Sequence, residues 1–201
     1  KRVLVISPHP DDEAIGCGGT IRRHIVEGDQ GGVVFFTSGE KGGHGRSEEE
    51  TIKIREREGK SAQSILGVER IEFYRQPDGA LGAGDDLVAR LTKTISRWRP
   101  QVIYAPHKLE THPDHRAAAK LIRSVVKRCK RPRPIVLMYE VWTPLGHMDR
   151  IVDITPFVQF KRRAIRAYRS QCAVMDFDAA ILGLNRYRGE MFCWPEGKYA
   201  E

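Results

Sequence analysis

The sequence predicts an α/β fold with a Rossmann-like, open and mostly parallel sheet that carries helices on both faces. Its 201 residues, 40% of them hydrophobic, are enough for one core, so we expect a single domain over residues 1–201. Short apolar runs alternate with longer helical stretches, which is the pattern of parallel strands joined by crossover helices. Two of the apolar runs lead into histidines and acids, as expected for a site beyond the carboxyl ends of strands.

The apolar runs identify the expected strands. The run VLVI at 3–6 is short and β-branched, which fits a buried parallel strand better than a helix. Similar runs predict strands at 33–37, 71–74, 102–105, 135–141 and 150–154. In the common order 3-2-1-4-5, strands one and four are neighbours where the order reverses. We therefore expect the residues that follow these two strands to meet in one crevice.

Helices are expected between the strands, at 12–27, 47–66, 85–98, 116–129, 157–171 and 178–186. The first contains Gly16, Gly18 and Gly19, whose missing side chains allow close approach to the sheet. Ser47 and Glu50 have the spacing of a capping box, and a glycine follows the expected end of that helix at residue 66.

Charge and composition narrow the class of protein. The net charge is +8, and the basic residues gather at 127–133 and 161–169 without interleaved aromatics or a nucleic-acid-binding motif. This favours a solvated basic face, or one that attracts an anionic small substrate, and no nucleic-acid partner. No run reaches the roughly 18 apolar residues of a membrane span, and no signal-peptide pattern opens the chain, so we expect a cytoplasmic protein. The four cysteines lack CxxC spacing, which indicates reduced, mostly buried thiols.

The first chemical motif is SPHPDDE at 7–13, directly after the first expected strand. Pro10 is expected in the first turn of the following helix, where its missing N–H costs nothing, and the three acids suit the positive end of the helix dipole. Such acids are often only caps. However, His9 and Asp12 are three residues apart and can converge on one cation while Asp11 points elsewhere.

The second motif is HPDH at 112–115, after the fourth expected strand. It is expected to face the first motif across the crevice. The first strand is not followed by GxGxxG, and its acidic turn would repel a pyrophosphate, so NAD binding is disfavoured.

The residue types alone leave the kind of metal site open. Four closed ligands, His9, Asp12, His112 and His115, would make a structural site, although structural zinc more often uses cysteine. Two histidines and one carboxylate also match a non-haem iron triad. Asp11 and His112 beside such a triad favour hydrolysis.

Together the two motifs resemble the LmbE-like or PIG-L family of zinc-dependent de-N-acetylases, which remove acetyl groups from N-acetylglucosamine-containing small molecules. The resemblance extends to TSGEKGG at 37–43, LGV at 66–68, PDG at 77–79, SQ at 170–171 and YAE at 199–201. It therefore covers nearly the whole chain.

By this resemblance, His9, Asp12 and His115 bind the metal, Asp11 is the general base and His112 stabilises the oxyanion. Three protein ligands leave an open position for water, whose pKa a cation such as Zn²⁺ brings down to about 7.

Further site residues are expected around this centre. Asp114 is placed to orient one of the histidines, and Arg55 and Asp78 match family positions associated with substrate recognition. Some family members have a tyrosine in the loop before the second motif, where this chain has Glu110. Structural or surface roles are expected for the remaining histidines, which are His24, His44, His107 and His147.

The expected activity is that of a metal-dependent hydrolase that removes an N-acetyl group from a GlcNAc-type glycoside. Zn²⁺ is the expected cofactor, with Fe²⁺ or another divalent metal as the alternative. A related amidase acting on a non-acetyl amide, or a basic nonenzymatic binding protein, is the alternative function. The expected partner is a small N-acetylated glycoside, with an anionic one favoured by the basic charge, and a homo-oligomer is compatible with the sequence.

Overall fold

The computed structural model describes residues 1–82, 84–129 and 131–201 and contains one parallel sheet in the order β3-β2-β1-β4-β5. The strands are β1 (Arg2–Ser7), β2 (Gln30–Phe35), β3 (Arg70–Phe73), β4 (Val102–Pro106) and β5 (Ile135–Tyr139). Val5 of β1 pairs with Val33 of β2 on one side and with Tyr104 of β4 on the other. The predicted order is confirmed, and the ends of β1 and β4 lie side by side.

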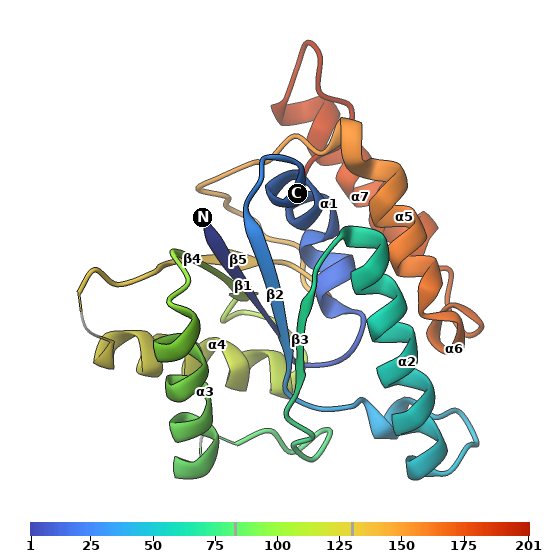
Figure 1. Cartoon of the computed structure of the whole chain (residues 1–201). Coiled ribbons are helices and arrows are strands. Elements are labelled where there is room, and N and C mark those ends of the chain that lie inside the picture. The colour runs from blue at the N-terminus through green and yellow to red at the C-terminus, as the bar shows by residue number, and fades with distance from the viewer. Residues whose placement is uncertain (83, 130) are drawn as a thin grey trace.

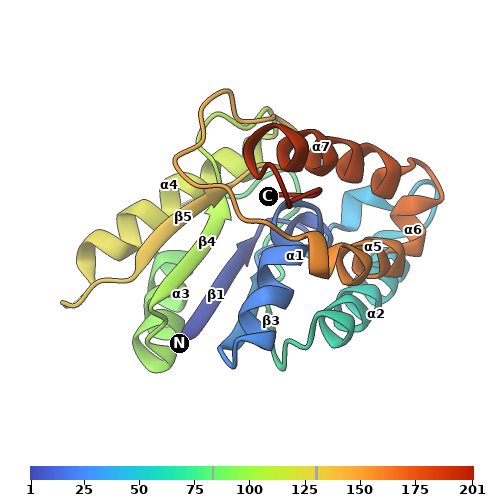
Figure 2. The same ribbon diagram turned by 90° about the horizontal axis from the view of Figure 1, so that it is seen from above.

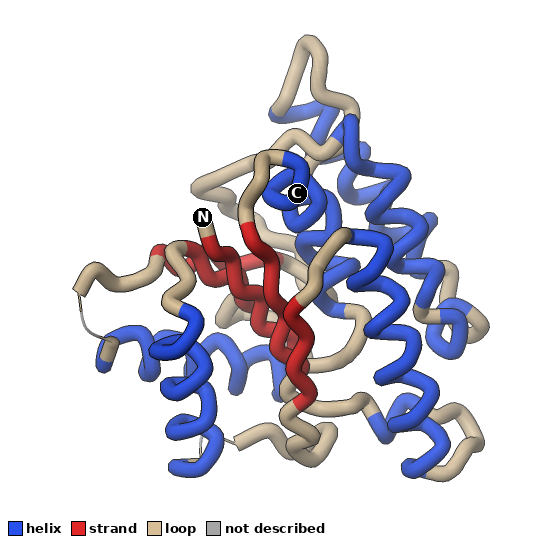
Figure 3. Tube along the Cα trace, viewed as in Figure 1, coloured by secondary structure: helices blue, strands red, loops and turns tan. Residues whose placement is uncertain are grey.

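Helices cover both faces of the sheet, as the alternating pattern predicts (Figures 1 and 3). Successive β1 residues alternate between two cores because neighbouring strand side chains point to opposite faces. The helices are α1 (Asp12–Val26), α2 (Glu48–Leu66), α3 (Asp85–Trp98), α4 (Pro113–Arg128), α5 (Val158–Ala167), α6 (Arg169–Cys172) and α7 (Phe177–Phe192), with short 3₁₀ turns η1 (Glu40–Gly42) and η2 (Thr155–Phe157). Val3 and Val5 belong to the core under α1, α2 and α5, whereas Leu4 and Ile6 belong to the core under α3 and α4.

Local signals explain several helix boundaries. Ser47 and Glu50 form the predicted capping box at the start of α2, and Gly67, with φ 85°, caps the helix after its last residue. Helix α3 has the predicted bounds. Helix α4 begins three residues earlier than predicted because the His112 side chain accepts a hydrogen bond from the Asp114 N–H and caps it.

The glycines of α1 allow close packing, as predicted. A Cβ on Gly16 would overlap the Tyr139 ring at the end of β5, and one on Gly19 would lie 2.7 Å from Ile154. The helix is also interrupted at Cys17, whose φ is −147°. Thus α1 lies against its neighbours without room for a larger residue at these positions.

A buried ion pair satisfies the backbone groups that this interruption releases. The Glu201 carboxylate accepts hydrogen bonds from Gly19 N and Thr20 N, and the Lys161 ammonium donates to Ile15 O and to Glu201. Lys161 is fully buried, so the prediction that residues 161–169 form a solvated basic face is wrong at this position. Lys130, part of the other basic segment, lies outside the described residues.

Three predicted elements differ in the structure. Residues 150–154 do not form a strand of the sheet, because Val152 exchanges backbone hydrogen bonds with Glu201 and Ile154 N donates to Tyr199 O near the C-terminus. The predicted helix at 157–171 is divided into α5 and α6, since Tyr168 turns out of the helix and donates to Glu13. Figure 2 shows α5 packed against α1 and α2, and α7 continues to residue 192, beyond its predicted end.

The expected start of the first helix is also wrong in one detail. Helix α1 begins at Asp12, so Pro10 lies in the preceding turn and not in the first helical turn. Asp11 has φ 132°, a conformation that breaks the helix there.

The cysteines and the helices can be compared with what the composition led us to expect. All four cysteines are free, but only Cys17 is buried and the other three are half-buried, so the expectation of mostly buried thiols is wrong. Among the described residues, no helix has the length and apolar character needed to cross a bilayer.

Candidate active site

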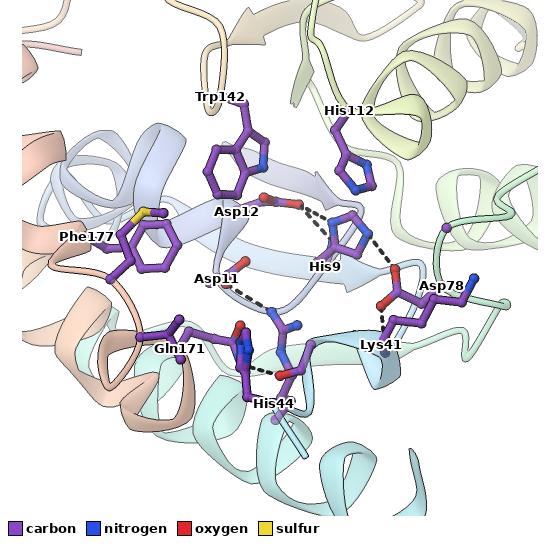
Figure 4. A pocket seen from close by; sticks show the side chains of 15 residues that line it. His9, Asp11, Asp12, Lys41, His44, Asp78, His112, Trp142, Gln171 and Phe177 are labelled. Carbon is purple, nitrogen blue, oxygen red and sulfur yellow. Dashed lines mark hydrogen bonds and ion pairs between the residues drawn. The ribbon is translucent and has the colours of Figure 1, made fainter. Parts of the chain in front are cut away.

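A cavity of about 350 Å³ opens at the carboxyl ends of β1 and β4 (Figure 4). Residues from both predicted motifs line it, together with residues from the glycine-rich loop after β2 and from the segment between α6 and α7. The sequence therefore identified the correct end of the sheet. Its lining includes His9, Asp11, Asp12, Lys41, His44, Arg55, Asp78, His112, Trp142, Gln171, Val174, Met175 and Phe177.

Three buried donor atoms form a compact triangle at the base of this site. Asp12 Oδ2 lies 3.2 Å from His9 Nδ1 and 3.1 Å from His115 Nε2, and the two histidine nitrogens are 3.4 Å apart. A tetrahedral cation with ligands at about 2.0–2.1 Å places neighbouring donors roughly 3.4 Å apart. The triangle thus has the dimensions of three corners of a tetrahedral metal site.

The turn after β1 and the first turn of α4 position these donors. Asp12 is the first residue of α1, and its Oδ2 also accepts the His9 N–H at 2.9 Å, which folds the turn back on itself. His115 is the third residue of α4. Because β1 and β4 are neighbours, the two motifs meet although about a hundred residues separate them.

Two carboxylates hold the far side of the His9 ring. His9 Nε2 lies 3.1 Å from Asp114 Oδ2 and 3.0 Å from Asp78 Oδ1. Asp114 also accepts the backbone N–H groups of Gly79 and Leu81. His9, Asp78 and Asp114 also group closely enough to hold a cation. Since backbone N–H groups already donate to Asp114, we infer that Asp114 and Asp78 orient the His9 ring and do not bind a second cation. In this orientation His9 Nδ1 faces Asp12 and His115.

The buried charges at this centre require a positive partner. Burial lowers the pKa of His115, but Asp12 and Glu110 outweigh it and raise the pKa to about 9. Burial raises the pKa of Asp12, but His115 and His9 bring it well below its usual range. Without a metal, protonated histidines balance the negative charge of Asp12. With a metal bound, the cation would balance this charge and both imidazoles would be neutral.

Asp11 lies beside the triangle in a constrained backbone. Its φ of 132° is rare for a non-glycine residue, and such strain is typical of functional turns. The Arg55 guanidinium donates to Asp11 Oδ2 at 2.9 Å, to Pro10 O at 2.6 Å and to Gly39 O at 3.0 Å, and Glu13 accepts the Asp11 N–H. Burial raises the pKa of Asp11 to about 7, with Arg55 opposing this shift.

His112 presents one defined nitrogen to the cavity. Its Nδ1 accepts the hydrogen bond from Asp114 N at 3.2 Å, and its pKa is lowered by burial and by His9. A neutral ring whose Nδ1 accepts must carry its proton on Nε2. His112 is therefore arranged as a hydrogen-bond donor, with its ring centroid 4.7 Å from that of His9.

The sequence matches the family model described as PIG-L: GlcNAc-PI de-N-acetylase over residues 4–126, more than half of the chain. The chain belongs to this family. It is 31% identical to the probable N-acetyl-alpha-D-glucosaminyl L-malate deacetylase 2 of Bacillus cereus, over 87% of this chain and 86% of the relative.

Two solved structures of similar proteins share the fold of this PIG-L family member. The conserved protein TT1542 from Thermus thermophilus has a TM-score of 0.86 and 32% identity, with 99% of this chain and 91% of that chain covered. N,N'-diacetylchitobiose deacetylase from Pyrococcus horikoshii has a TM-score of 0.86 and 28% identity, with 100% and 82% covered.

Arg55 and Asp78 both line the cavity, but protein groups occupy much of their hydrogen-bonding capacity. The two terminal nitrogens of Arg55 donate to Asp11 and to backbone oxygens, and the side chain is almost fully buried. Asp78 accepts the Lys41 N–H at 3.0 Å and contacts His9. These contacts point to positioning of Asp11 and His9, and the contact of Arg55 and Asp78 with substrate stays a prediction.

Glu110 is a site residue whose role the sequence did not reveal. Its buried carboxylate accepts the N–H groups of Val141, Trp142 and Thr143 at 2.6–3.2 Å, and Oε2 lies 3.7 Å from His115 Nδ1. Its position two residues before HPDH was the available signal. Glu110 anchors the loop after β5, and its carboxylate faces His115 Nδ1, which has no hydrogen-bond partner among the described residues, from just beyond hydrogen-bond distance.

Sequence reasoning also missed an apolar wall of the cavity, which consists of Trp142, Val174, Met175 and Phe177. Trp142 lies in the loop after β5, Val174 and Met175 lie between α6 and α7, and Phe177 is the first residue of α7. In sequence they show no periodicity that would mark them as one surface.

The remaining histidines lie at structural or surface positions, as predicted, and one of them, His44, also lines the cavity. His24 bonds Asp29 and Tyr104, and His147 is exposed. His107 bonds Thr143 O and faces Glu110, within the support of the second motif. His44 is exposed but lines the cavity.

Proposed function

We propose that this chain, as a single domain over residues 1–201, is a metal-dependent hydrolase that removes an N-acetyl group from a GlcNAc-containing small molecule. One observation carries this proposal: a triangle of donors with metal-site dimensions lies in the same cavity as a strained carboxylate and a neutral histidine donor. Similarity to the L-malate and diacetylchitobiose deacetylases supports the substrate class.

His9, Asp12 and His115 would hold the cation, and their donors fit it in type and spacing. A divalent cation such as Zn²⁺ supplies Lewis acidity to the amide carbonyl and lowers the pKa of water. Zn²⁺ fits two imidazoles and a carboxylate, and Fe²⁺ is the alternative for the same donor set.

Asp11 would accept the proton of the attacking water and return it to the leaving amine. A carboxylate with a pKa of about 7 is suited to both steps at neutral pH, and a nearby cation would lower that pKa. Arg55 holds the Asp11 carboxylate by donating a hydrogen bond to it, and Glu13 holds the Asp11 backbone by accepting its N–H.

His112 would stabilise the negative charge that develops on the amide oxygen, through its protonated Nε2. Because Asp114 N fixes the tautomer, this donor is oriented before substrate binds. Asp114 and Asp78 would orient His9, and Glu110 would orient His115. Asp78 and Arg55 would in addition contact sugar hydroxyls at the cavity wall.

The test is amine release from N-acetylglucosamine glycosides by protein loaded with one equivalent of Zn²⁺, repeated after removal of the metal by a chelator. We expect turnover that is lost with the metal and restored by adding it back. Turnover of another amide but no N-acetyl glycoside would favour the related amidase. No metal binding at all would favour a nonenzymatic binding protein.

A further inference from the structure

Glu13 is a buried carboxylate that holds the backbone of the proposed base. Its side chain is closed off from solvent, and its Oε2 atom accepts the Asp11 N–H at 3.2 Å. This N–H belongs to the residue whose φ is 132°. A non-glycine residue keeps such a conformation only where the surrounding structure fixes it, so the placement of the Glu13 carboxylate determines the placement of Asp11.

Two donors from distant parts of the chain fix the other oxygen of this carboxylate. The Tyr168 hydroxyl donates to Glu13 Oε1 at 2.6 Å, and the Gln63 Nε2 amide donates to the same oxygen at 2.7 Å. Hydrogen bonds to an ionised carboxylate are shorter and stronger than those between neutral groups. Because a carboxylate is planar and rigid, the two bonds that fix Oε1 also fix the direction in which Oε2 meets the Asp11 N–H.

Both donors have features that the contact with Glu13 explains. Tyr168 separates α5 from α6 with a non-helical ψ of 62°, and its side chain points into the core with only 1% of the residue exposed. Gln63 is fully buried, and its Oε1 atom has no hydrogen-bond partner among the protein groups that the structure describes. A buried amide oxygen without a protein partner is unfavourable, so the bond to Glu13 sets the orientation of this amide.

We infer that Tyr168 and Gln63 are positioning residues for the reaction, which through Glu13 fix the backbone of Asp11 and hence the direction of the carboxylate that takes the proton from water. This inference rests on the proposed function. Neither Tyr168 nor Gln63 is among the described residues that line the cavity, so their effect on the reaction passes through Glu13. Arg55 holds the Asp11 carboxylate directly, and this second set of contacts holds its backbone.

The first test is Tyr168→Phe, which removes one hydroxyl and keeps the ring. With metal-loaded protein and an N-acetylglucosamine glycoside, we expect kcat to fall roughly 10- to 100-fold, as loss of an outer partner of a metal site typically does. KM and Zn²⁺ affinity should not change, because the ligands and the cavity lining stay intact.

Tyr104→Phe is the matched control. It also removes a hydroxyl from a buried tyrosine of the same core, and that hydroxyl bonds His24 and not a residue of the site. The control should keep the wild-type kcat. Unchanged kcat in Tyr168→Phe, or an equal loss in both variants, would overturn the inference, because a loss common to both tyrosines reflects packing alone.

Gln63→Met tests the second donor and keeps the question open to experiment if Tyr168→Phe does not fold. Methionine has a similar length but cannot donate to Glu13 Oε1, so kcat should again fall at unchanged KM. In a Glu13→Gln background, Gln63→Met should have little further effect on kcat, since residues that act through one partner are not additive. Two independent, multiplied losses would show that Gln63 does not act through Glu13.

An amide exchange measurement distinguishes failure of this inference from failure of the proposed function. If wild-type protein hydrolyses no N-acetyl glycoside, the proposed function fails, and hydrogen exchange of the Asp11 N–H, followed by NMR, still tests the contact. We expect this exchange to be roughly tenfold faster in Tyr168→Phe and unchanged in Tyr104→Phe, because weaker anchoring of Glu13 frees the N–H. Equal exchange rates in wild-type protein and Tyr168→Phe would show that Tyr168 does not fix Asp11.

Discussion

Arg55 holds the carboxylate of Asp11 through a hydrogen bond of 2.9 Å, and the same nitrogen donates to Pro10 O one residue earlier. One buried guanidinium thereby fixes both the side chain and the strained backbone of the proposed base. Its other terminal nitrogen reaches Gly39 O, which ties the glycine-rich loop to the same point. This role differs from the contact with substrate alone that the sequence suggested for Arg55.

Arg55→Lys should therefore impair chemistry more than binding. A lysine keeps the charge but cannot donate in two fixed directions, so Asp11 would lose its orientation. We expect kcat to fall by roughly 10²-fold, as misplacement of a catalytic group by about 1 Å can do, with a smaller rise in KM from the altered contact with sugar hydroxyls. Steady-state kinetics on a GlcNAc glycoside give both values, and a rise in KM at unchanged kcat would instead assign Arg55 to substrate binding alone.

Glu110→Gln tests the support of His115. The amide keeps the size of the side chain, but its neutral oxygen is a weaker acceptor for the three backbone N–H groups and its NH₂ faces His115 Nδ1 with a donor. Loss of such a partner typically costs 10- to 100-fold in metal affinity. Competition titration of Zn²⁺ against a chromophoric chelator measures the affinity. Wild-type affinity in a folded variant would show that Glu110 only anchors the loop after β5.

Lys161→Met should destabilise the protein. It leaves the Glu201 carboxylate buried without its cation and removes the donor to Ile15 O inside the interrupted helix α1. Breaking one side of a buried pair costs about 3–5 kcal/mol, which urea unfolding would record as a lower midpoint. As a control, Arg23→Ala breaks the exposed ion pair between Arg23 of α1 and Glu27, the residue after that helix, and should leave the midpoint unchanged. Equal midpoints for both variants would contradict the structural role of Lys161.

Much of the fold could be predicted from sequence because its signals are local. Short β-branched runs defined five strands, and the Ser47–Glu50 box and Gly67 marked the ends of α2. The sixth expected strand failed because partners distant in sequence decide its pairing. Residues 152 and 154 bond to the C-terminal segment, and no local property of 150–154 signals that.

The residues of the site also divide into those that the sequence predicted and those whose roles depend on tertiary packing. Strand order predicted that the two motifs meet, and the family resemblance singled out His9, Asp12 and His115, whose donor atoms the structure places within 3.4 Å of one another. The support of Asp11 by Arg55 and Glu13 depends on side-chain packing between α1 and α2. The apolar wall depends on the approach of the loop after β5 to residues 174–177 at the start of α7, which no local property of the sequence signals.

The neighbours Asp11 and Asp12 provide the most direct test, because these two adjacent aspartates have different roles in the proposed mechanism. Zn²⁺ affinity and kcat would be measured together for Asp11→Asn and Asp12→Asn. Asp11→Asn should retain metal affinity while kcat falls by roughly 10²- to 10⁴-fold, since the amide cannot accept a proton. Asp12→Asn should lose metal affinity, with activity partly restored by excess Zn²⁺. The assignment of Asp12 to the metal and of Asp11 to proton transfer would be contradicted if Asp11→Asn lost the metal while Asp12→Asn retained it. Near-normal kcat in Asp11→Asn would also contradict it.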